Sequence, residues 1–501
     1  IIQSSARQET TLKTRPSTQT ILALLGLTSA AALSVGIIWQ FLVQPALLSE
    51  YISKPLLSLW HIQKSVPDIQ TRMIFGFIAL GLLNGAGWWF IRKVPKAWGW
   101  ILFILGGLGS AAALLWMYPY GASDIFDYIV RGRISGVYSG NPFINLPAEY
   151  PNDPFYNYMW WHDAPTAYGP LWELLAGLSA RLAGDGIIAN VIAFKCLSGV
   201  FWIGSTAVVA RILHRSNPSQ VLPRTLLFAW NPILLYETFG NGHNDIVMVF
   251  FILLACWAFL ENKLLPGFLA LTGGVLVKFV PGLLLPAALA FSWRSLTGTR
   301  SRVRFTLLAG MACAALVAAT YAPFFSGFQN FYLAHQQTLF TTSLPAVTYQ
   351  LLKGWLGGYA SPYVSLGAWI LTAIWVFWQA FRLWRQPEIG FPQAAFHSLY
   401  FFLLVTITWF QPWYTPWVLA LAVLLPSPWL WMAEVLVFFT RSKPLIFVPI
   451  TYWESPYPPQ PWLEIQLTLG VMGIPWLFTL AALLRERVYL HKAAQAPPTR
   501  D

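Results

Sequence analysis

Charged residues are scarce in this chain: only 10% of its 501 residues are Asp, Glu, Lys or Arg, whereas 56% are hydrophobic and the mean hydropathy is +0.55. Soluble domains carry about a quarter charged residues, so the composition excludes a soluble globular protein. Apolar stretches of about 18 or more residues recur along the whole length, and each is long enough to cross a hydrocarbon core of about 30 Å. We therefore expect an all-α polytopic membrane protein.

Cysteine and the common cofactor motifs are also rare or missing. The three cysteines, Cys196, Cys256 and Cys313, all lie in apolar segments, which argues against a disulfide framework or a zinc site and predicts core packing. The sequence contains no Walker loop, HExxH pair or EF-hand spacing, so we expect no cofactor, no metal and no nucleotide dependence. The formal net charge is +12, but the basic residues form short clusters between apolar segments, which does not indicate nucleic-acid binding.

These basic clusters orient the chain, because Arg and Lys gather at the cytoplasmic ends of membrane crossings. If the basic N-terminal residues Arg7, Lys13 and Arg15 are cytoplasmic, the clusters within 92–96, 211–215 and 294–304 fall on the same side. Residues 119–186 then lie outside, and both termini are cytoplasmic. We expect about 12 to 14 segments, at about 20–40, 73–91, 98–118, 187–210, 224–239, 246–261, 264–292, 305–325, 363–382, 395–410, a short pair around 426–428, and 464–484.

Basic residues flank the segment 264–292 at both ends: Lys263 precedes it, and Arg294, Arg300, Arg302 and Arg304 follow it. Both ends are therefore expected in the cytoplasm, which a single crossing cannot satisfy. Two half-helices that meet near Lys278 and are broken by Pro281 satisfy it, because irregular backbone is tolerated where it lines a cavity. Lys278 then points towards the outer side. A cation at the tip of a broken helix is suited to holding a phosphate.

Acidic residues are concentrated in the segment 119–186, which holds seven of the 19 in the chain. If SDIFDYIVRGR is helical, Asp124, Asp127, Tyr128 and Arg131 share a face, and Asp127 pairs with Arg131 at i,i+4. Asp124 has no basic partner four residues on and is the freer base. The alternative is that both aspartates only cap or solvate the start of a helix at the membrane surface.

Further along, aromatic and ionisable residues recur at the expected outer side. GNPF and YGPLWE mix turn formers with aromatics. The aromatic residues Tyr158, Trp160, Trp161 and Trp172 argue against disorder in this loop, and such rings commonly stack on sugars, although packing at the membrane interface also explains them. In WNPILLYETFGNGHND, Asp245 is either a helix cap or a site residue. Ionisable groups at membrane depth usually face a functional cavity, which singles out Glu237 and His243.

Several of these segments, in order, resemble the landmarks of the GT-C glycosyltransferases, most of all the polyprenol-phosphate-mannose-dependent mannosyltransferases and their relatives. They are SDIFDYIVRGRI with GNPF, then YGPLW, NGHND, LVKFVPGLLLP and FQPWYTPW, over roughly 120–420. The resemblance implies an acidic residue in an early external loop as catalytic base, which is Asp124 by motif match, and a polyprenyl-phosphate sugar donor. In many of the class the acidic loop follows the first crossing, whereas here it follows the third.

We therefore expect a membrane glycosyltransferase that moves a sugar, by preference mannose, from a polyprenyl-phosphate donor to a lipid-linked or glycan hydroxyl with inversion, in a bacterial or archaeal plasma membrane with its site facing outside. Catalysis is assigned to Asp124 and Asp127. The expected substrate-binding residues are Tyr128, Arg131, Tyr168, Trp172, Glu237, His243, Asp245, Lys278, Trp413 and Tyr414. A transporter or flippase of lipid-linked sugars is the alternative, because broken helices and intramembrane charges also mark transport pathways.

The expected organisation has four parts. Residues 1–118 form N-terminal transmembrane segments, and residues 119–186 form an extracytoplasmic catalytic loop. Residues 187–430 form a GT-C-like transmembrane core, and residues 431–501 form C-terminal transmembrane segments with a cytoplasmic tail. The partners of such a protein are the donor, the acceptor and membrane lipids.

Overall fold

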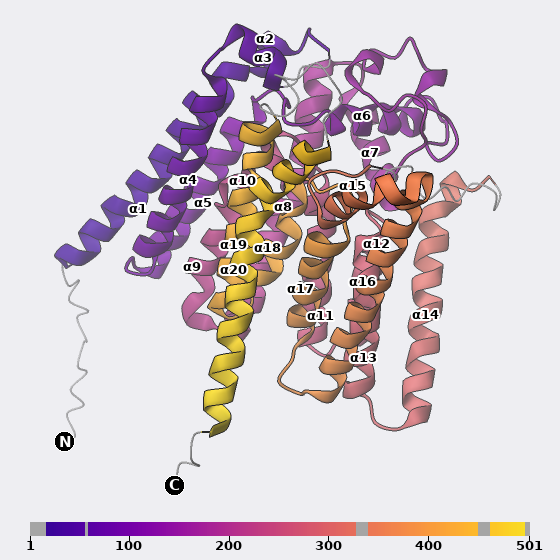
Figure 1. The fold of residues 1–501 in the computed structure, drawn as a ribbon. Coiled ribbons are helices and arrows are strands. Elements are labelled where there is room, and N and C mark those ends of the chain that lie inside the picture. The colour runs from indigo at the N-terminus through magenta and orange to yellow at the C-terminus, as the bar shows by residue number, and fades with distance from the viewer. Residues whose placement is uncertain (1–16, 56–58, 327–338, 449–460, 496–501) are drawn as a thin grey trace, which may run out of the picture.

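The computed structural model describes residues 17–55, 59–326, 339–448 and 461–495. Within these ranges the chain is helical and contains no strand beyond two isolated bridges. Long helices run side by side, and short helices lie across one end of the bundle (Figure 1). Arg7, Lys13 and Arg15, from which the expected orientation starts, and residues 496–501 of the expected tail lie outside the described ranges.

Seven helical segments among the described residues are long and apolar enough to cross a membrane. They are Thr18–Ala46 (α1 and its continuation), Ile69–Ile91 (α4), Lys96–Leu115 (α5), Ile187–Ser216 (α8), Thr299–Phe324 (α14), Leu344–Arg385 (α15 and α16) and Trp462–Leu484 (within α20). Three shorter apolar helices add Asp245–Leu260 (α11), Leu264–Val275 (α12) and Phe391–Thr406 (α17 and its continuation). All of these overlap the expected segments, and the count of 12 to 14 stays a prediction.

Two of the expected segments are broken. The helix at 264–292 is interrupted as predicted: α12 ends at Val275, a 3-10 turn covers Val280–Leu284, and α13 spans Leu285–Ser295. The segment 224–239, expected as one crossing, is interrupted as well: it consists of α9 (Val221–Ala229), α10 (Pro232–Leu235) and a π-helical turn, and whether it crosses the membrane stays a prediction. Pro232 starts α10, and the Asn231 side chain caps it by accepting hydrogen bonds from two backbone amides.

The segment 119–186 contains two helices, α6 (Asp124–Gly136) and α7 (Pro170–Ala183). The first was expected. The second was not, because Gly169 and Pro170 resemble a turn, whereas proline is well suited to the first position of a helix. The two helices pack closely: a Cβ added at Gly136 would collide with the backbone of Gly177, so no side chain fits there.

Buried charge fixes this unit. The guanidinium of Arg133 is buried and forms ion pairs with Asp153 at 2.6 Å and with Asp185 at 2.7 Å. Asp153 also accepts a 2.7 Å hydrogen bond from the hydroxyl of Tyr138. Residues from three parts of the expected loop are thereby held together, so the loop has a defined structure.

The remaining helices complete the bundle. They are α2 (Leu48–Tyr51), α3 (Leu59–Ser65), α18 (Pro416–Ala422) and α19 (Ser427–Thr440). Within the longer segments named above, the α-helices themselves are α14 (Thr299–Tyr321), α15 (Leu344–Leu356), α16 (Ala360–Arg385), α17 (Phe391–Phe401) and α20 (Pro461–Gln495). The tip that joins α13 to α14 lies at the end of the bundle opposite α6 (Figure 1). That tip carries the basic cluster 294–304.

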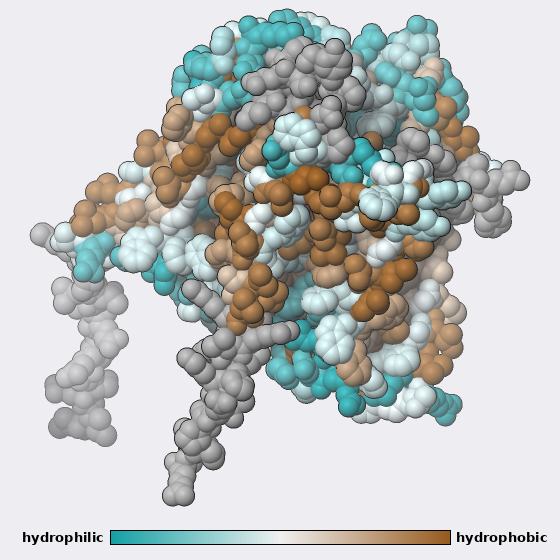
Figure 2. Space-filling view, in the orientation of Figure 1, coloured by the Kyte–Doolittle hydropathy of each residue, from teal (hydrophilic) through white to brown (hydrophobic). Residues whose placement is uncertain are grey.

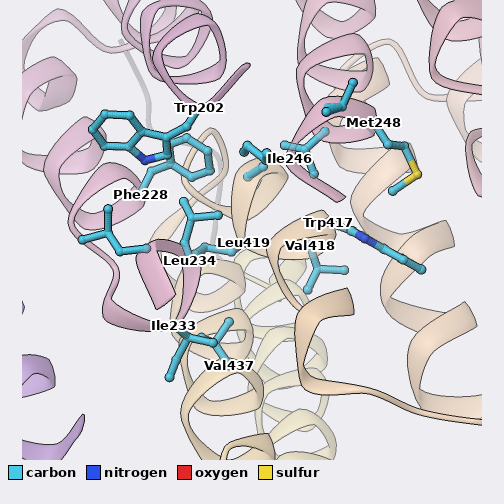
Figure 3. Close-up of a cluster of buried hydrophobic side chains, with 14 of the residues drawn as sticks. Trp202, Phe228, Ile233, Leu234, Ile246, Met248, Trp417, Val418, Leu419 and Val437 are labelled. Atoms are coloured by element: carbon cyan, nitrogen blue, oxygen red, sulfur yellow. The ribbon is translucent and has the colours of Figure 1, made fainter. Parts of the chain in front are cut away.

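Hydrophobic residues gather in a belt over the middle of the molecule, between hydrophilic residues at its two ends (Figure 2). Inside, α11 and α18 contribute to one cluster of buried side chains, among them Ile246, Met248 and Trp417 (Figure 3).

Of the three cysteines only Cys256 is fully buried, and Cys196 is exposed on α8, so the expectation of core packing is wrong for Cys196.

Candidate active site

A cavity of about 540 Å³ lies between α6 with the following loop and the membrane helices. One side is formed by the start of α6 and residues 161–168, and the other by the 278–283 turn, α16 and residues 402–417. Seven of the expected site residues line it: Asp124, Asp127, Arg131, Tyr168, Lys278, Trp413 and Tyr414. They come from positions nearly 300 residues apart in the sequence, and the fold brings them to one space.

Asp124 is the first residue of α6 and is partly exposed to the cavity. Its carboxylate takes part in none of the hydrogen bonds or ion pairs of the described residues. Burial, and next the negative charge of Asp127, raise the pKa of Asp124 to about 7. This aspartate therefore combines an unengaged carboxylate with a pKa close to neutral pH.

Asp127 and Arg131 form the predicted i,i+4 pair, with 2.9 Å between Nε and Oδ2. The other two nitrogens of Arg131 donate to the backbone carbonyls of Ala164 at 2.9 Å and Trp161 at 3.2 Å. All three guanidinium nitrogens are thus engaged within the protein. Arg131 thereby joins α6 to the loop that faces the cavity.

Lys278 enters the cavity from the break between α12 and the 3-10 turn. Its ammonium lies 2.8 Å from Oδ1 of Asp245, which also accepts a 2.7 Å hydrogen bond from the indole of Trp417. The same ammonium lies 5.5 Å from the ring centre of Tyr168 and 5.7 Å from that of Tyr414. A carboxylate and aromatic faces therefore fix the position of this cation.

Five expected substrate-binding residues do not line the cavity. Tyr128 and Trp172 are buried behind Tyr168, where the hydroxyl of Tyr168 donates to that of Tyr128 at 3.2 Å and the rings of Tyr128 and Trp172 meet edge to face. Their packing fixes Tyr168, which does line the cavity. Asp245 likewise lies behind Lys278 and reaches the cavity only through it.

Glu237 and His243 belong to a separate buried network. Glu237 forms a 2.6 Å ion pair with Arg441 and accepts a 2.7 Å hydrogen bond from Asn241. The ring of His243 lies 4.3 Å from that of Trp413, centre to centre, so it touches the cavity lining from behind. These contacts explain why both side chains are buried, and neither places a charge in the cavity.

Sequence reasoning missed several residues that line the cavity. Trp417 is among them, and so are the apolar side chains Phe279, Leu283 and Trp369; Trp161, considered only as one of several loop aromatics, also lines the cavity. Trp417 stands in the FQPWYTPW segment, so that motif carried a signal for it. No local pattern marks the others, because their neighbours in the cavity come from distant helices.

The cavity thus has a polar part, where a free carboxylate and a fixed ammonium are present, and an apolar part formed by membrane helices. A carboxylate with a pKa near 7 is suited to take a proton from a hydroxyl, and an ammonium is suited to stabilise a departing phosphate. No cluster of three or more His, Cys, Asp or Glu side chains with a metal-binding arrangement occurs among the described residues. Independence of metals stays a prediction.

The fold and this cavity define a helical membrane protein with an acid and a cation at one end of an apolar bundle. The sequence profile described as "Alpha-(1->6)-mannopyranosyltransferase, N-terminal domain" matches residues 23–294, which is more than half of the chain. The chain therefore belongs to this family, and the expected resemblance to GT-C mannosyltransferases is confirmed. The matched range includes Asp124, Asp127 and Lys278 but not the segment 402–417.

Two individual relatives are proteins of Corynebacterium glutamicum. Alpha-(1->6)-mannopyranosyltransferase A is 22% identical over 175 residues, which are 34% of this chain and 35% of that protein. Alpha-(1->6)-mannopyranosyltransferase B is 23% identical over 149 residues, which are 28% of this chain and 24% of that protein. The chain thus matches about a third or less of the length of these relatives.

Proposed function

We propose that this protein is an integral membrane mannosyltransferase that uses a polyprenyl-phosphate mannose donor and a glycan or lipid-linked acceptor. The observation that carries the proposal is the presence of the unengaged carboxylate of Asp124 and the fixed ammonium of Lys278 on one cavity. The names of the two relatives support mannose as the sugar and an α-1,6 linkage as the product.

The proposed reaction is a direct displacement. The acceptor oxygen forms a bond to the anomeric carbon of mannose while the bond from that carbon to the phosphate oxygen breaks. Asp124 takes the proton of the acceptor hydroxyl, and the departing polyprenyl phosphate keeps the electron pair beside the ammonium of Lys278. A single displacement inverts the anomeric carbon, and no covalent sugar intermediate on the enzyme is formed.

The apolar part of the cavity supports a lipid-linked donor. Phe279 and Trp369 line the cavity and are 46% and 43% exposed, so an aliphatic chain that enters between the helices meets apolar surface. Lys278 is the residue before Phe279, so a phosphate bound at this ammonium would have the first part of its lipid beside apolar surface. This arrangement also supports entry of the donor from the membrane.

The proposed orientation has the cavity outside and the basic tip at 294–304 in the cytoplasm. The helix α6, whose start lines the cavity, and this tip lie at opposite ends of the bundle (Figure 1), in keeping with the gathering of basic residues on the cytoplasmic side. The four-part organisation is part of the same proposal, with residues 119–186 as the catalytic loop. A bacterial or archaeal plasma membrane is the proposed location.

The test is transfer by purified protein in lipid nanodiscs, with polyprenyl-phosphate mannose as donor and octyl α-mannoside as acceptor. Asp124→Asn keeps the shape of the side chain and removes the base, so we expect transfer to fall by about 10²-fold to 10⁴-fold. Asp127→Asn should cost less, through local order. Asp163→Asn is a matched control, because Asp163 is an exposed acid of the same loop that does not line the cavity.

Retained transfer in both Asp124→Asn and Asp127→Asn contradicts the assignment of the base. If only Asp127→Asn is inactive, the two aspartates have the reverse roles. A flippase would move the labelled donor across a vesicle membrane without any mannosylated product. That result would replace the proposed function with the transport alternative.

A further inference from the structure

Two adjacent tryptophans on the outer loop differ in their surroundings. Trp160 is 64% exposed and does not line the cavity. Trp161 is 38% exposed, and it lines the cavity together with Asp127 and Arg131. Packing at the membrane interface would explain two exposed tryptophans equally, whereas only one of them faces the space where chemistry is proposed.

The segment that carries Trp161 is held in place from both sides. The buried guanidinium of Arg131 donates to the carbonyls of Trp161 and Ala164, and its remaining nitrogen donates to Asp127. On the other side, a ring nitrogen of His162 lies 2.9 Å from the carbonyl of Tyr156. None of these contacts uses the indole of Trp161, which therefore remains available to a ligand.

The contact to Arg131 relates Trp161 to the proposed base. Arg131 follows Asp124 by seven residues, which is about 10 Å of helix axis at about 1.5 Å per residue. The loop carbonyl of Trp161 is bonded to Arg131 and not to the start of the helix. The guanidinium of Arg131 reaches back to Asp127, three residues after Asp124, so Trp161 is anchored beside α6 beyond its first residues and lines the same cavity as Asp124. A sugar that presents a hydroxyl to Asp124 can therefore place its neighbouring ring at Trp161.

We propose that Trp161 forms a subsite for the acceptor, in which its indole stacks on a hexose ring that precedes the sugar receiving mannose. This rests on the proposed function and names the acceptor class: a glycan with at least two hexose units. An aromatic face suits the C–H face of a pyranose, and the buried Asp127 and Arg131 pair beside it holds the subsite rigid. Arg131 and Asp127 thus act as positioning residues for this subsite.

The proposal predicts a difference between short and longer acceptors. In nanodiscs, the wild type should have a lower KM for octyl α-1,6-mannobioside than for octyl α-mannoside. Trp161→Ala should raise the KM for the mannobioside by about tenfold, the effect of losing about 1.4 kcal/mol of aromatic contact, and leave that for the single mannoside unchanged. The KM for the donor should not change, and Trp161→Phe should restore most of the preference.

Trp160→Ala is the control, because it removes an equally large and more exposed indole from the same loop. We expect wild-type kinetics for this variant with both acceptors. Equal effects of Trp160→Ala and Trp161→Ala would overturn the subsite and assign both indoles to the membrane interface. An unchanged mannobioside preference in Trp161→Ala would overturn it as well.

A binding measurement separates this proposal from the proposed function. Saturation-transfer NMR of octyl α-1,6-mannobioside with wild type, Trp161→Ala and Trp160→Ala requires no catalysis. Loss of the signal only in Trp161→Ala supports the subsite, even if no donor yields transfer and the proposed reaction fails. Transfer that proceeds while all three proteins give the same signal overturns the subsite and leaves the reaction in place.

Discussion

Lys278 and Asp245 form an ion pair of 2.8 Å, although they stand 33 residues apart, one in the break after α12 and the other at the start of α11. Asp245 is the first residue of α11 and is buried, whereas Lys278 lines the cavity. The indole of Trp417 donates to the same carboxylate oxygen. Asp245 is therefore a positioning residue: it touches no substrate space and determines where the cation stands.

Replacing Lys278 by Met keeps most of the length of the unbranched side chain and removes its charge. If this ammonium stabilises the departing phosphate, we expect kcat to fall by about 10²-fold or more, with the protein still folded. The measurement is steady-state transfer, with thermal unfolding in detergent as the check on folding. Unchanged turnover would mean that the lysine only supports the turn, with its stem along apolar surface.

Asp245→Asn tests the positioning role, because it keeps a group that accepts the hydrogen bond of Trp417 and removes the charge that holds Lys278. We expect a higher KM for the donor, by about threefold to tenfold, since a mobile cation must be ordered when the phosphate binds. Asp245→Glu should restore part of the loss. A purely structural aspartate would lower the folding stability without changing the donor KM, and would not be rescued in KM by Glu.

The rate should depend on pH through Asp124. Its pKa is raised to about 7, chiefly by burial and next by Asp127, and a base acts only when it is deprotonated. We therefore expect kcat/KM to rise with pH up to an inflection near 7 and to level off above it. Asp127→Asn removes a neighbouring negative charge, so the inflection should move to lower pH. An inflection that does not respond to Asp127→Asn would mean that another group controls the rate.

Glu173 provides a pH dependence of stability. Its carboxyl is fully buried in α7, and although Thr166 donates a hydrogen bond to it, burial raises its pKa to about 7. Because the folded pKa exceeds the ordinary value of about 4.5, the folded state binds more protons, and stability falls as pH rises from about 4.5 through 7. The difference amounts to about 1.4 kcal/mol per pKa unit as an upper bound.

Glu173→Gln removes this titration and keeps an oxygen for Thr166. Relative to wild type, its thermal stability should improve steadily between pH 5 and pH 7.5, and the difference should stay constant above that. The measurement is the unfolding temperature in detergent at each pH. Parallel curves for the two proteins would show that Glu173 stays ionised in the folded state.

The sequence predicted those parts of the fold that depend on local pattern. Apolar runs located the membrane helices, and Pro281 located the break beside Lys278, since a proline in a helix removes a hydrogen bond. The i,i+4 spacing predicted the pair of Asp127 and Arg131. In each case the interacting groups are close in the sequence.

The remaining features depend on contacts between distant segments. Glu237 was expected to face a functional cavity, but it is paired with Arg441, which follows 204 residues later. The helix α7 was missed because Pro170 is a turn former as well as a helix starter, and its packing against the glycines of α6 decides between the two. The two adjacent residues Trp160 and Trp161 look alike in the sequence, and only Trp161 lines the cavity, where a contact from Arg131 holds its backbone.

The last prediction concerns the orientation on which the whole proposal depends. Basic residues cluster in the tip that contains Arg300, and Trp160 is exposed near the cavity at the other end. Because Arg and Lys gather on the cytoplasmic side, Trp160→Cys should react with a membrane-impermeant maleimide added to intact cells, and Arg300→Cys should react only after the membrane is opened. The native Cys196 is exposed on α8 and is replaced by Ala in both variants, so that it does not contribute to the signal. Labelling of Arg300→Cys in intact cells, together with protection of Trp160→Cys, would place the cavity in the cytoplasm, where Asp124 and Lys278 would meet a donor from the inner leaflet instead.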